Sequence, residues 1–271
     1  MTSDAGAGIG YTGIRIRGVD PTRTNVTING IPINDSESHG MYWVNMPDIS
    51  SSVNNIQVQR GVGTSSNGAS AFGASINVET NTLNKEAYAT LDNSFGSFNT
   101  LRNTVKAGTG LLNDKFIIDT RLSSIQSDGY VDRSAAELKS FMLSGTWLGE
   151  NSALRATMFS GKERTEQAWY GTPESVINGS IEEITAYADR NYIFGSDREN
   201  LLTAGRKYNY YTYDNEVDNY QQDHYQLHWN QKIDAYTSLS LGLNYTYGRG
   251  YYEAVSYTHL RAHETVLDLV C

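Results

Sequence analysis

The sequence predicts a mainly β protein in two parts, a small mixed domain followed by antiparallel strands of an incomplete transmembrane β-barrel. Three observations indicate this fold: β-type runs alternate with turn residues, the runs lengthen after residue 84, and short connections alternate with long ones. Hydrophobic residues make up 39% of the 271 residues, and the mean hydropathy is −0.48. No run approaches the roughly 20 apolar residues of a spanning helix. This criterion does not detect barrel strands, because apolar and polar residues alternate along them and their mean hydropathy is polar.

Charge and cysteine content narrow the function classes. With 30 acidic and 21 basic residues the net charge is −9, which argues against a nucleic-acid partner. Cys271 is the single cysteine, so no disulfide forms within the chain. No charged and then apolar signal segment stands at the start, and we expect Met1 to be a start inside a longer gene.

The first part, residues 1–82, contains short β-type runs separated by Gly, Asn, Asp and Ser. Asn29-Gly30 is a strong hairpin signal, because both residues accept the positive φ angles of a two-residue turn. A helical turn is expected near residues 47–52. These features predict a small mixed domain with short strands.

In the second part, residues 83–256, apolar and polar residues alternate over seven expected strands. These strands are 86–94, 99–109, 116–126, 138–147, 153–163, 219–233 and 238–252. In the last of them Leu239, Leu241 and Leu243 share one face, while Asn, Ser, Thr and Gly occupy the other. The pattern suits strands between lipid and a wet or plugged lumen. It suits a soluble antiparallel sandwich equally well.

Connection lengths favour the barrel over the sandwich. Short turns are expected at 111–115, 148–152 and 234–237, and long connections at 127–137 and 164–218. The connection at 95–97 is an exception, because it is short where alternation of short and long connections requires a long one. Short turns at one rim and long loops at the other are typical of outer-membrane barrels. Seven strands leave an open edge that hydrocarbon does not tolerate, so we expect further strands beyond this chain. Residues 257–271 break the alternation and are expected to be a non-native tail.

Four motifs of the first part resemble, in order and spacing, the plug domain of a TonB-dependent outer-membrane receptor. They are Arg15-Ile-Arg-Gly18, Asn25-Val-Thr-Ile-Asn-Gly-Ile-Pro-Ile33, Ile56-Gln-Val-Gln-Arg-Gly61 and Gly68-Ala-Ser-Ala-Phe-Gly-Ala-Ser-Ile-Asn-Val-Glu-Thr80. Asn29-Gly30 replaces the family's common Asp-Gly, and Ala74-Ser75 stand where further glycine is common. The second part is also similar to the family, especially to receptors of Bacteroidetes, through 108–114, 127–130 and 167–173.

The resemblance implies a plug domain at 1–82 and the first strands of a barrel of roughly 22 strands at 83–256. The residues that match the plug signature are Arg17, Gly18, Asn29, Gly30, Arg60, Gly61, Gly68, Gly73 and Asn77. It also implies active uptake of a scarce solute at the cell outer membrane of a Gram-negative bacterium. The partners would be the TonB–ExbB–ExbD energy-coupling complex of the full-length parent, a small solute or metal complex, and outer-membrane lipid. The box on which that complex pulls is not among these residues.

Motifs for other chemistry are weak. Gly61-Val-Gly63 lacks the third glycine of a dinucleotide fingerprint, since Ser66 stands there. His224 and His228 lie about 13 Å apart on a strand, too far for one metal ion. Acidic pairs such as Glu163 with Glu166 are expected to be solvated loop charges. No catalytic cluster emerges, so we expect no enzyme, no cofactor and no metal site.

The candidate solute contacts are aromatic and polar residues of the expected outer loops. They are His39, Tyr42 and Trp43 in a plug loop, and Trp169 and Tyr170 at the start of the longest barrel loop. Aromatic rings stack on sugars, macrocycles or catecholates. Packing of Tyr42 and Trp43 between plug and wall is an equally good interpretation.

Among solutes, an iron–siderophore complex, haem or cobalamin is favoured, because Val26-Thr-Ile-Asn-Gly30 departs from the form usual in oligosaccharide importers. An oligosaccharide importer of the same family remains an alternative. A surface carbohydrate-binding protein or adhesin is a second one, and it predicts a separately folding sandwich. A secreted hydrolase is disfavoured by the missing catalytic cluster.

Overall fold

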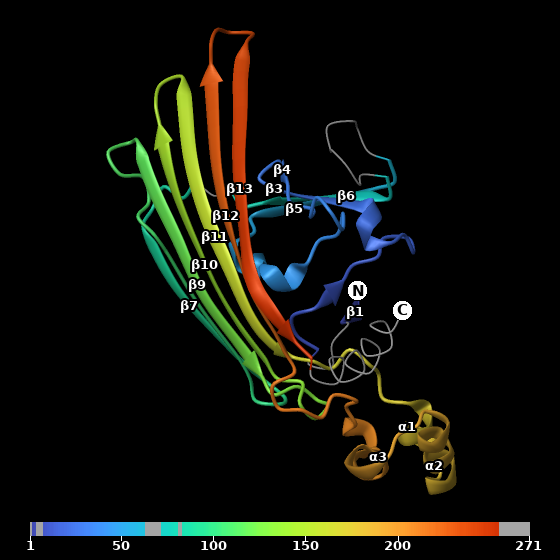
Figure 1. Cartoon of the computed structure of the whole chain (residues 1–271). Helices are drawn as coiled ribbons and strands as arrows, with labels where there is room; N and C mark the ends of the chain where they lie inside the picture. Colours follow the sequence, from blue (N-terminus) through green and yellow to red (C-terminus); the bar gives the residue numbers. More distant parts are fainter. Residues whose placement is uncertain (1, 4–7, 63–71, 81–82, 255–271) are drawn as a thin grey trace, which may run out of the picture.

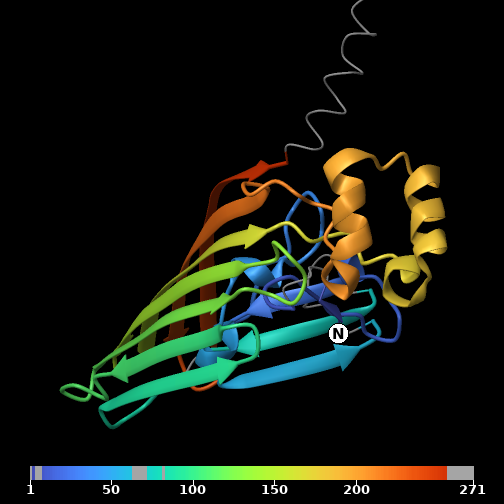
Figure 2. The same cartoon turned by 90° about the horizontal axis from the view of Figure 1, so that it is seen from below.

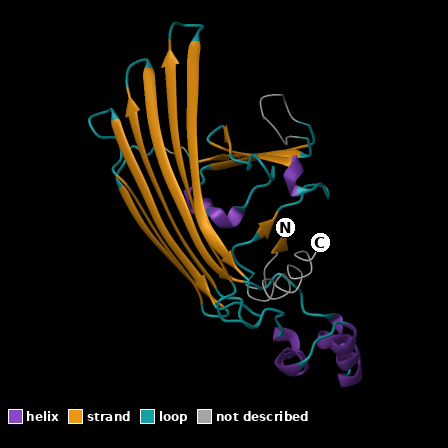
Figure 3. Ribbon diagram, viewed as in Figure 1, coloured by secondary structure: helices purple, strands orange, loops and turns teal. Residues whose placement is uncertain are grey.

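The computed structural model describes residues 2–3, 8–62, 72–80 and 83–254. A curved antiparallel sheet forms one layer, and a small domain lies against its concave face (Figure 1). Among these residues, helices are confined to the small domain and to one long loop at the end of the sheet (Figure 3). The expected tail 257–271 and the signature residue Gly68 lie outside the described residues.

The small domain is built on a four-stranded sheet of order β4-β3-β6-β5, in which β3 and β6 are parallel. Its elements are β1 (Thr2–Ser3), β2 (Thr12–Gly13), η1 (Pro21–Arg23), β3 (Thr24–Ile28), β4 (Ile31–Pro32), η2 (Trp43–Asn45), η3 (Ile49–Ser52), β5 (Asn55–Arg60) and β6 (Ala74–Glu79). The predicted hairpin is confirmed, since Asn29 and Gly30 have φ of 55° and 81° and join β3 to β4. The helical turn predicted at 47–52 is confirmed as η3.

The large sheet contains seven strands in the order β13-β12-β11-β10-β9-β8-β7, all antiparallel, and it does not close. The strands are β7 (Tyr88–Gly96), β8 (Thr100–Gly108), β9 (Phe116–Ser127), β10 (Ala136–Leu148), β11 (Ser152–Glu166), β12 (Val217–Lys232) and β13 (Ser238–Glu253). The seven predicted strands are confirmed, with ends shifted by a few residues. Short turns gather at one end and the long connections at the other, as predicted, and the short connection between β7 and β8 is the expected exception at the long-connection end.

The two faces of the large sheet differ in chemistry. On the convex face, one row of paired residues runs Leu143, Met158, Tyr225 and Tyr245 across four strands. Leu143 is 46% exposed and Tyr245 is 62% exposed. The concave face beneath the small domain is polar, with Ser144, Thr157 and Gln226 among its buried residues. The predicted division into an apolar and a polar face is therefore confirmed.

The longest connection, which we expected to be a loop, contains three helices. They are α1 (Glu174–Asn178), α2 (Ile181–Arg190) and α3 (Gly195–Thr203), followed by the turn η4 (Gly205–Lys207) (Figure 2). A capping box between Ser180 and Glu183 starts α2. Val176, Ile184, Ala188, Leu201 and Tyr208 form a separate apolar core for this segment. Burial raises the pKa of Tyr208 to about 12.

No helix among the described residues is both long and apolar enough to cross a membrane.

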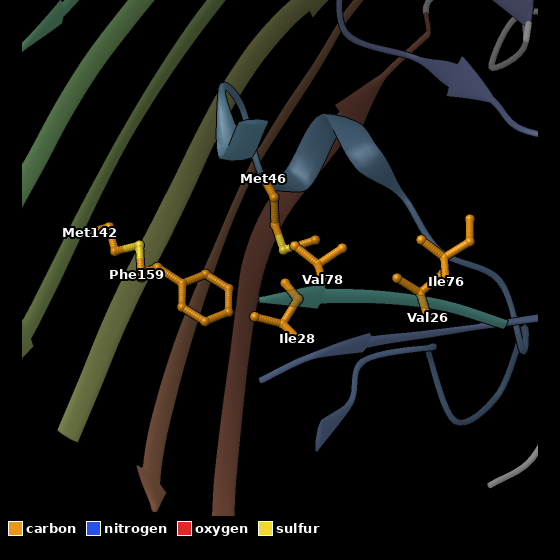
Figure 4. Close-up of a cluster of buried hydrophobic side chains, with 7 residues drawn as sticks. All are labelled: Val26, Ile28, Met46, Ile76, Val78, Met142 and Phe159. Carbon is orange, nitrogen blue, oxygen red and sulfur yellow. The ribbon is translucent and has the colours of Figure 1, made fainter. Parts of the chain in front are cut away.

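An apolar cluster joins the small domain to the large sheet. Val26, Ile28, Ile76 and Val78 come from β3 and β6, Met46 follows η2, and Met142 and Phe159 come from the concave face of β10 and β11 (Figure 4). All of these residues are at least nine-tenths buried. Removing such side chains from water supplies the non-directional part of the attachment.

A buried polar cluster, which we term the Asp48 anchor, supplies the directional part. The carboxylate of Asp48 accepts hydrogen bonds from Thr104 Oγ1 at 2.6 Å and Ser123 Oγ at 2.7 Å, both on the large sheet. Arg102 Nε donates to it at 3.1 Å. Ser51 Oγ of the small domain adds a further bond at 2.7 Å. Burial raises the pKa of Asp48, but these bonds and the Arg102 charge hold it below its ordinary value.

Arg121 completes the Asp48 anchor from β9. Its side chain is 4% exposed, and its guanidinium donates to the backbone carbonyl of Asp48. It also lies 3.9 Å from the Asp48 carboxylate and donates to Ser140 Oγ at 3.2 Å. Ser140 in turn donates to the carbonyl of Pro47 at 2.6 Å. The anchor therefore joins one turn of the small domain to three strands of the sheet.

Next to the anchor, the small domain approaches the backbone of β11 closely. A Cβ atom added at Gly161 would lie 2.5 Å from Pro47 Cδ and 2.8 Å from the carbonyl carbon of Asn45. Real Cβ atoms essentially never approach other atoms this closely. Glycine at this position therefore sets how near the two layers come.

Candidate functional site

A cavity of about 810 Å³ lies between the small domain and the concave face of β11 to β13. It sits at the end of the sheet that carries the long connections, since the residues lining it include Glu163, Trp169 and Asp218. The small domain contributes Tyr11 and the segment from Pro32 to Met46. A volume of this size is in the range of small-molecule pockets.

One side of the cavity is acidic. Glu163 is 2% exposed, and its Oε2 atom has no hydrogen-bond partner among the described residues. Asp218 accepts a hydrogen bond from the Tyr11 hydroxyl at 2.6 Å, and Thr165 donates to the same hydroxyl at 3.2 Å. Burial, with the negative charge of Glu163, raises the pKa of Tyr11, so this phenol stays protonated and donates. Glu163 was expected to be a solvated loop charge, and that expectation was wrong.

The physical reason for this correction is the alternation of side chains along β11. The strand continues to Glu166, and Glu163 alternates in phase with Phe159 and Gly161 on the concave face. Tyr11 of the small domain lies next to this part of β11, since Thr165 donates to its hydroxyl and both Tyr11 and Glu163 line the cavity. Glu166 is half-buried and accepts a hydrogen bond from the backbone of Ala135 at 2.9 Å.

His224 forms a buried part of the cavity wall. It is 3% exposed, stacks on Phe159 with ring centroids 4.5 Å apart, and bonds to Thr246 Oγ1 at 3.0 Å. Its other ring nitrogen lies 3.1 Å from Gln222 Oε1. His228 bonds instead to the carbonyl of Asn29 at 2.9 Å. The two histidines therefore serve separate polar contacts.

The structure brings two of the five candidate solute residues to the cavity. Tyr42 lines it and is 52% exposed, and Trp169 lines it with its ring edge-on to Tyr11 at 4.3 Å. Trp43 packs against the apolar cluster of the small domain. Tyr170 contacts Tyr210 and Tyr211 in the long connection; His39 is exposed outside the cavity lining.

The loop that carries Tyr42 is held by local hydrogen bonds. Asn34 accepts from the Val26 amide at 2.7 Å and donates to the carbonyl of His39 at 2.9 Å. Asp35 accepts from the Ser38 amide at 2.7 Å and from the Ser38 hydroxyl at 2.9 Å. These bonds lower the pKa of Asp35, so its carboxylate stays charged at the cavity mouth.

The plug-signature residues that the structure describes occupy turns and strand contacts rather than the cavity. Arg17 and Gly18 both have positive φ in a turn that brings Ile16 opposite Val19. Gly61 has a φ of 82° directly after Arg60, the last residue of β5. A Cβ atom on Gly73 would lie 2.9 Å from the carbonyl oxygen of Arg23.

Two asparagines of the same signature tie strands together. Asn29 accepts from the Thr80 amide at 2.9 Å and donates to Gln226 of the large sheet at 3.3 Å. Asn77 accepts from Thr27 Oγ1 at 2.8 Å across the parallel pair β3–β6. Asn77 therefore stabilises the small domain internally, and Asn29 also joins the small domain to the large sheet.

A second cavity of about 680 Å³ lies at the short-turn end of the sheet. Lys106, Asp119 and Arg121 line it together with the η3 segment. Among the described residues no group of three or more His, Cys, Asp and Glu is placed to hold a metal ion. Of these two cavities, the first lies at the end with the long connections and is lined by Tyr42, Trp169 and an acidic side, and it is the candidate site.

Sequence reasoning missed three residues that define this site, Tyr11, Glu163 and Asp218. Their contacts span more than 150 residues of sequence, so no local pattern links Tyr11 to the strands. The alternation of the expected strand 153–163 was the available signal for Glu163, because it places this residue on the same face as Phe159 and Gly161.

Residues 1–75 match the family model described as the TonB-dependent receptor plug domain. Among solved structures, the ferric-catecholate import receptor Fiu of E. coli K12 in its open form has a TM-score of 0.63 at 17% identity, covering 92% of this chain and 35% of that one. The ferric citrate transporter FecA gives 0.64 at 17%, with 93% and 36% covered. The ferric yersiniabactin receptor FyuA of Yersinia pestis gives 0.64 at 13%, with 93% and 37% covered.

Nothing among the curated proteins matches the sequence. The chain spans about a third of the length of these solved structures. At such identities the likeness concerns the fold, which is a plug followed by an antiparallel sheet of the barrel type.

Proposed function

We propose that this chain, part of a TonB-dependent receptor, acts in the active uptake of a scarce small solute across the outer membrane of a Gram-negative cell. The observation that carries the proposal is the cavity between plug and sheet at the end with the long connections. A solute that enters from that side meets Tyr42 and Trp169 before it reaches the buried residues of the plug.

The convex face of the sheet supports a membrane location. Its exposed side chains include Leu143, Trp147, Leu241 and Tyr245, and a lipid environment covers such a surface without cost. Exposure of an apolar surface of this extent to water is unfavourable. In the proposed arrangement the plug spans residues 1–82 and the barrel strands occupy 83–256.

The proposed partners follow from the same family. The TonB–ExbB–ExbD complex would supply energy to the full-length parent, and outer-membrane lipid would surround the sheet. For the solute we favour an iron–siderophore complex, haem or cobalamin. The solved neighbours named above are receptors or transporters for ferric complexes, which supports the first of these.

Growth of the native host on defined iron sources tests the proposal. Deletion of the gene at its native length is expected to abolish growth on at least one ferric complex, and so is deletion of the host's TonB protein. Restoring the gene with Trp169→Ala is expected to reduce uptake at limiting solute about tenfold, because an aromatic wall of the cavity is lost.

The matched control is Trp147→Ala, which removes a tryptophan from the convex face, away from the cavity. It should leave the solute concentration for half-maximal uptake unchanged. A native-length protein that is absent from the membrane fraction contradicts the proposal, as does uptake that is independent of TonB.

A further inference from the structure

The concave face holds a buried carboxylate that the plug and the sheet leave incomplete. Glu163 Oε2 is shielded from solvent, and no donor among the described residues reaches it. Isolated carboxylates are expensive to bury, and they are normally paired with a cation or with several donors. Glu163 also lines the candidate cavity, so a rotation of its carboxyl group presents Oε2 to a molecule bound there.

A second carboxylate lies next to the first. Glu163 pairs with Tyr220 and Thr165 pairs with Asp218, which makes Glu163 and Asp218 diagonal neighbours on the concave face. Diagonal positions of this kind are about 7–8 Å apart at the backbone, within reach of one small group. Asp218 uses one oxygen for the Tyr11 hydroxyl and retains acceptor capacity.

The remaining lining strengthens the negative character of this cavity. Asp35 adds a third carboxylate at the mouth, and the described lining residues include no lysine and no arginine. His224 is a buried ring whose two nitrogens are already engaged by Thr246 and Gln222. An anionic complex would therefore meet repulsion on this side of the cavity.

We propose that the Glu163–Asp218 pair binds a cationic nitrogen group, an ammonium or guanidinium, carried by the transported solute. This inference rests on the proposed uptake function and names the chemical class of the solute. Trp169 lines the same cavity and contacts Tyr11, the hydrogen-bond partner of Asp218, so an aromatic ring is near the proposed cation. A bare metal ion fits less well, because it needs more ligands than the described residues gather here.

Two ferric complexes that differ by one charge test the inference. Ferrioxamine B carries a free ammonium group, and its N-acetyl derivative lacks that group. Binding of each to the detergent-solubilised, native-length receptor is followed by quenching of tryptophan fluorescence. The wild type is expected to bind the ammonium form at least about tenfold more tightly than the acetylated form. This ratio corresponds to the contribution of one hydrogen bond to a charged group.

Glu163→Gln is expected to bring the ratio of the two affinities close to one, mainly by weakening the ammonium form. Glu137→Gln is the matched control, because Glu137 lies on the convex face of the adjacent strand and pairs with Lys139. It should keep the wild-type ratio. Asp218→Asn provides a second variant, and unchanged thermal unfolding of each variant shows that the site and not the fold was altered.

Equal affinity of the wild type for the two complexes overturns the inference, as does a preference that survives Glu163→Gln. Binding of neither complex also overturns it. These outcomes do not test uptake itself, which the growth experiment tests separately. TonB-dependent import of a neutral or anionic complex would support the proposed uptake function and contradict the cation site.

Discussion

Asp48→Asn is expected to weaken the attachment of the plug to the sheet by about 3–5 kcal/mol, the usual effect of breaking a buried ion pair from one side. The variant leaves the buried Arg121 guanidinium without its counter-charge and reduces the acceptors offered to Thr104 and Ser123. Asparagine tolerates the φ of 54° at this position, so the backbone turn is preserved. Hydrogen exchange of the amides of residues 48–53 in the native-length protein measures the loss.

The matched control is Asp114→Asn. Asp114 has a φ of 56° but lies exposed in the turn between β8 and β9. Its substitution should change the exchange free energy of residues 48–53 by less than about 0.5 kcal/mol, as for a surface site. Equal protection of these amides in Asp48→Asn and in the wild type contradicts the role assigned to the anchor.

The anchor also has a defined pH dependence. The folded-state pKa of Asp48 lies below its ordinary value of 3.8, so its contribution is fully present above pH 3.8. That contribution is lost as the pH falls from there through the folded-state pKa. Asp48→Asn removes the titrating group. In this variant the protection of the amides around position 48 against hydrogen exchange should not fall with pH in this range.

Gly161→Ala is expected to displace the plug and cost about 1–3 kcal/mol, the usual penalty for overpacking. The new methyl group meets Pro47 and the backbone of Asn45 on the plug side, while β11 is fixed by its two neighbouring strands. Neither the plug backbone nor β11 can shift without loss of contacts. We therefore expect a lower midpoint of thermal unfolding and faster proteolysis of the plug segment 40–53.

Gly145→Ala provides the comparison for this substitution. Gly145 lies on β10, the adjacent strand, and a Cβ atom there meets nothing within 4 Å. The variant should match the wild type in both measurements. Proteolysis of Gly161→Ala at the wild-type rate would show that the layers are less tightly apposed than the structure indicates.

Most of the sheet could be predicted because its information is local. Alternation along β10 and β13 reports directly which side chains face the plug and which face outward, and Asn29-Gly30 permits a turn with two positive φ angles. These features act over a few residues. They needed no knowledge of how distant segments meet.

The candidate site was predicted only in part, because its contacts are not local. Tyr42 and Trp169 were expected and lie at the cavity, but Tyr11 reaches Asp218 across 207 positions. The burial of Glu163 depends on a plug segment that no strand pattern reveals. The helices α1 to α3 were missed for a related reason, since a small apolar core of their own, closed by Tyr208, holds them in place.

The order of elements along the chain determines how the plug responds to tension. A pull from the N-terminal side loads β3 before it reaches Asp48, because force passes along the chain until contacts carry it. In single-molecule stretching, residues 8–46 should extend first, by at most on the order of 130 Å, with a second step when the anchor breaks. Asp48→Asn should lower the force of the second step and leave that of the first unchanged. The anchor thus divides the domain into a compliant leading segment and a mechanically resistant remainder.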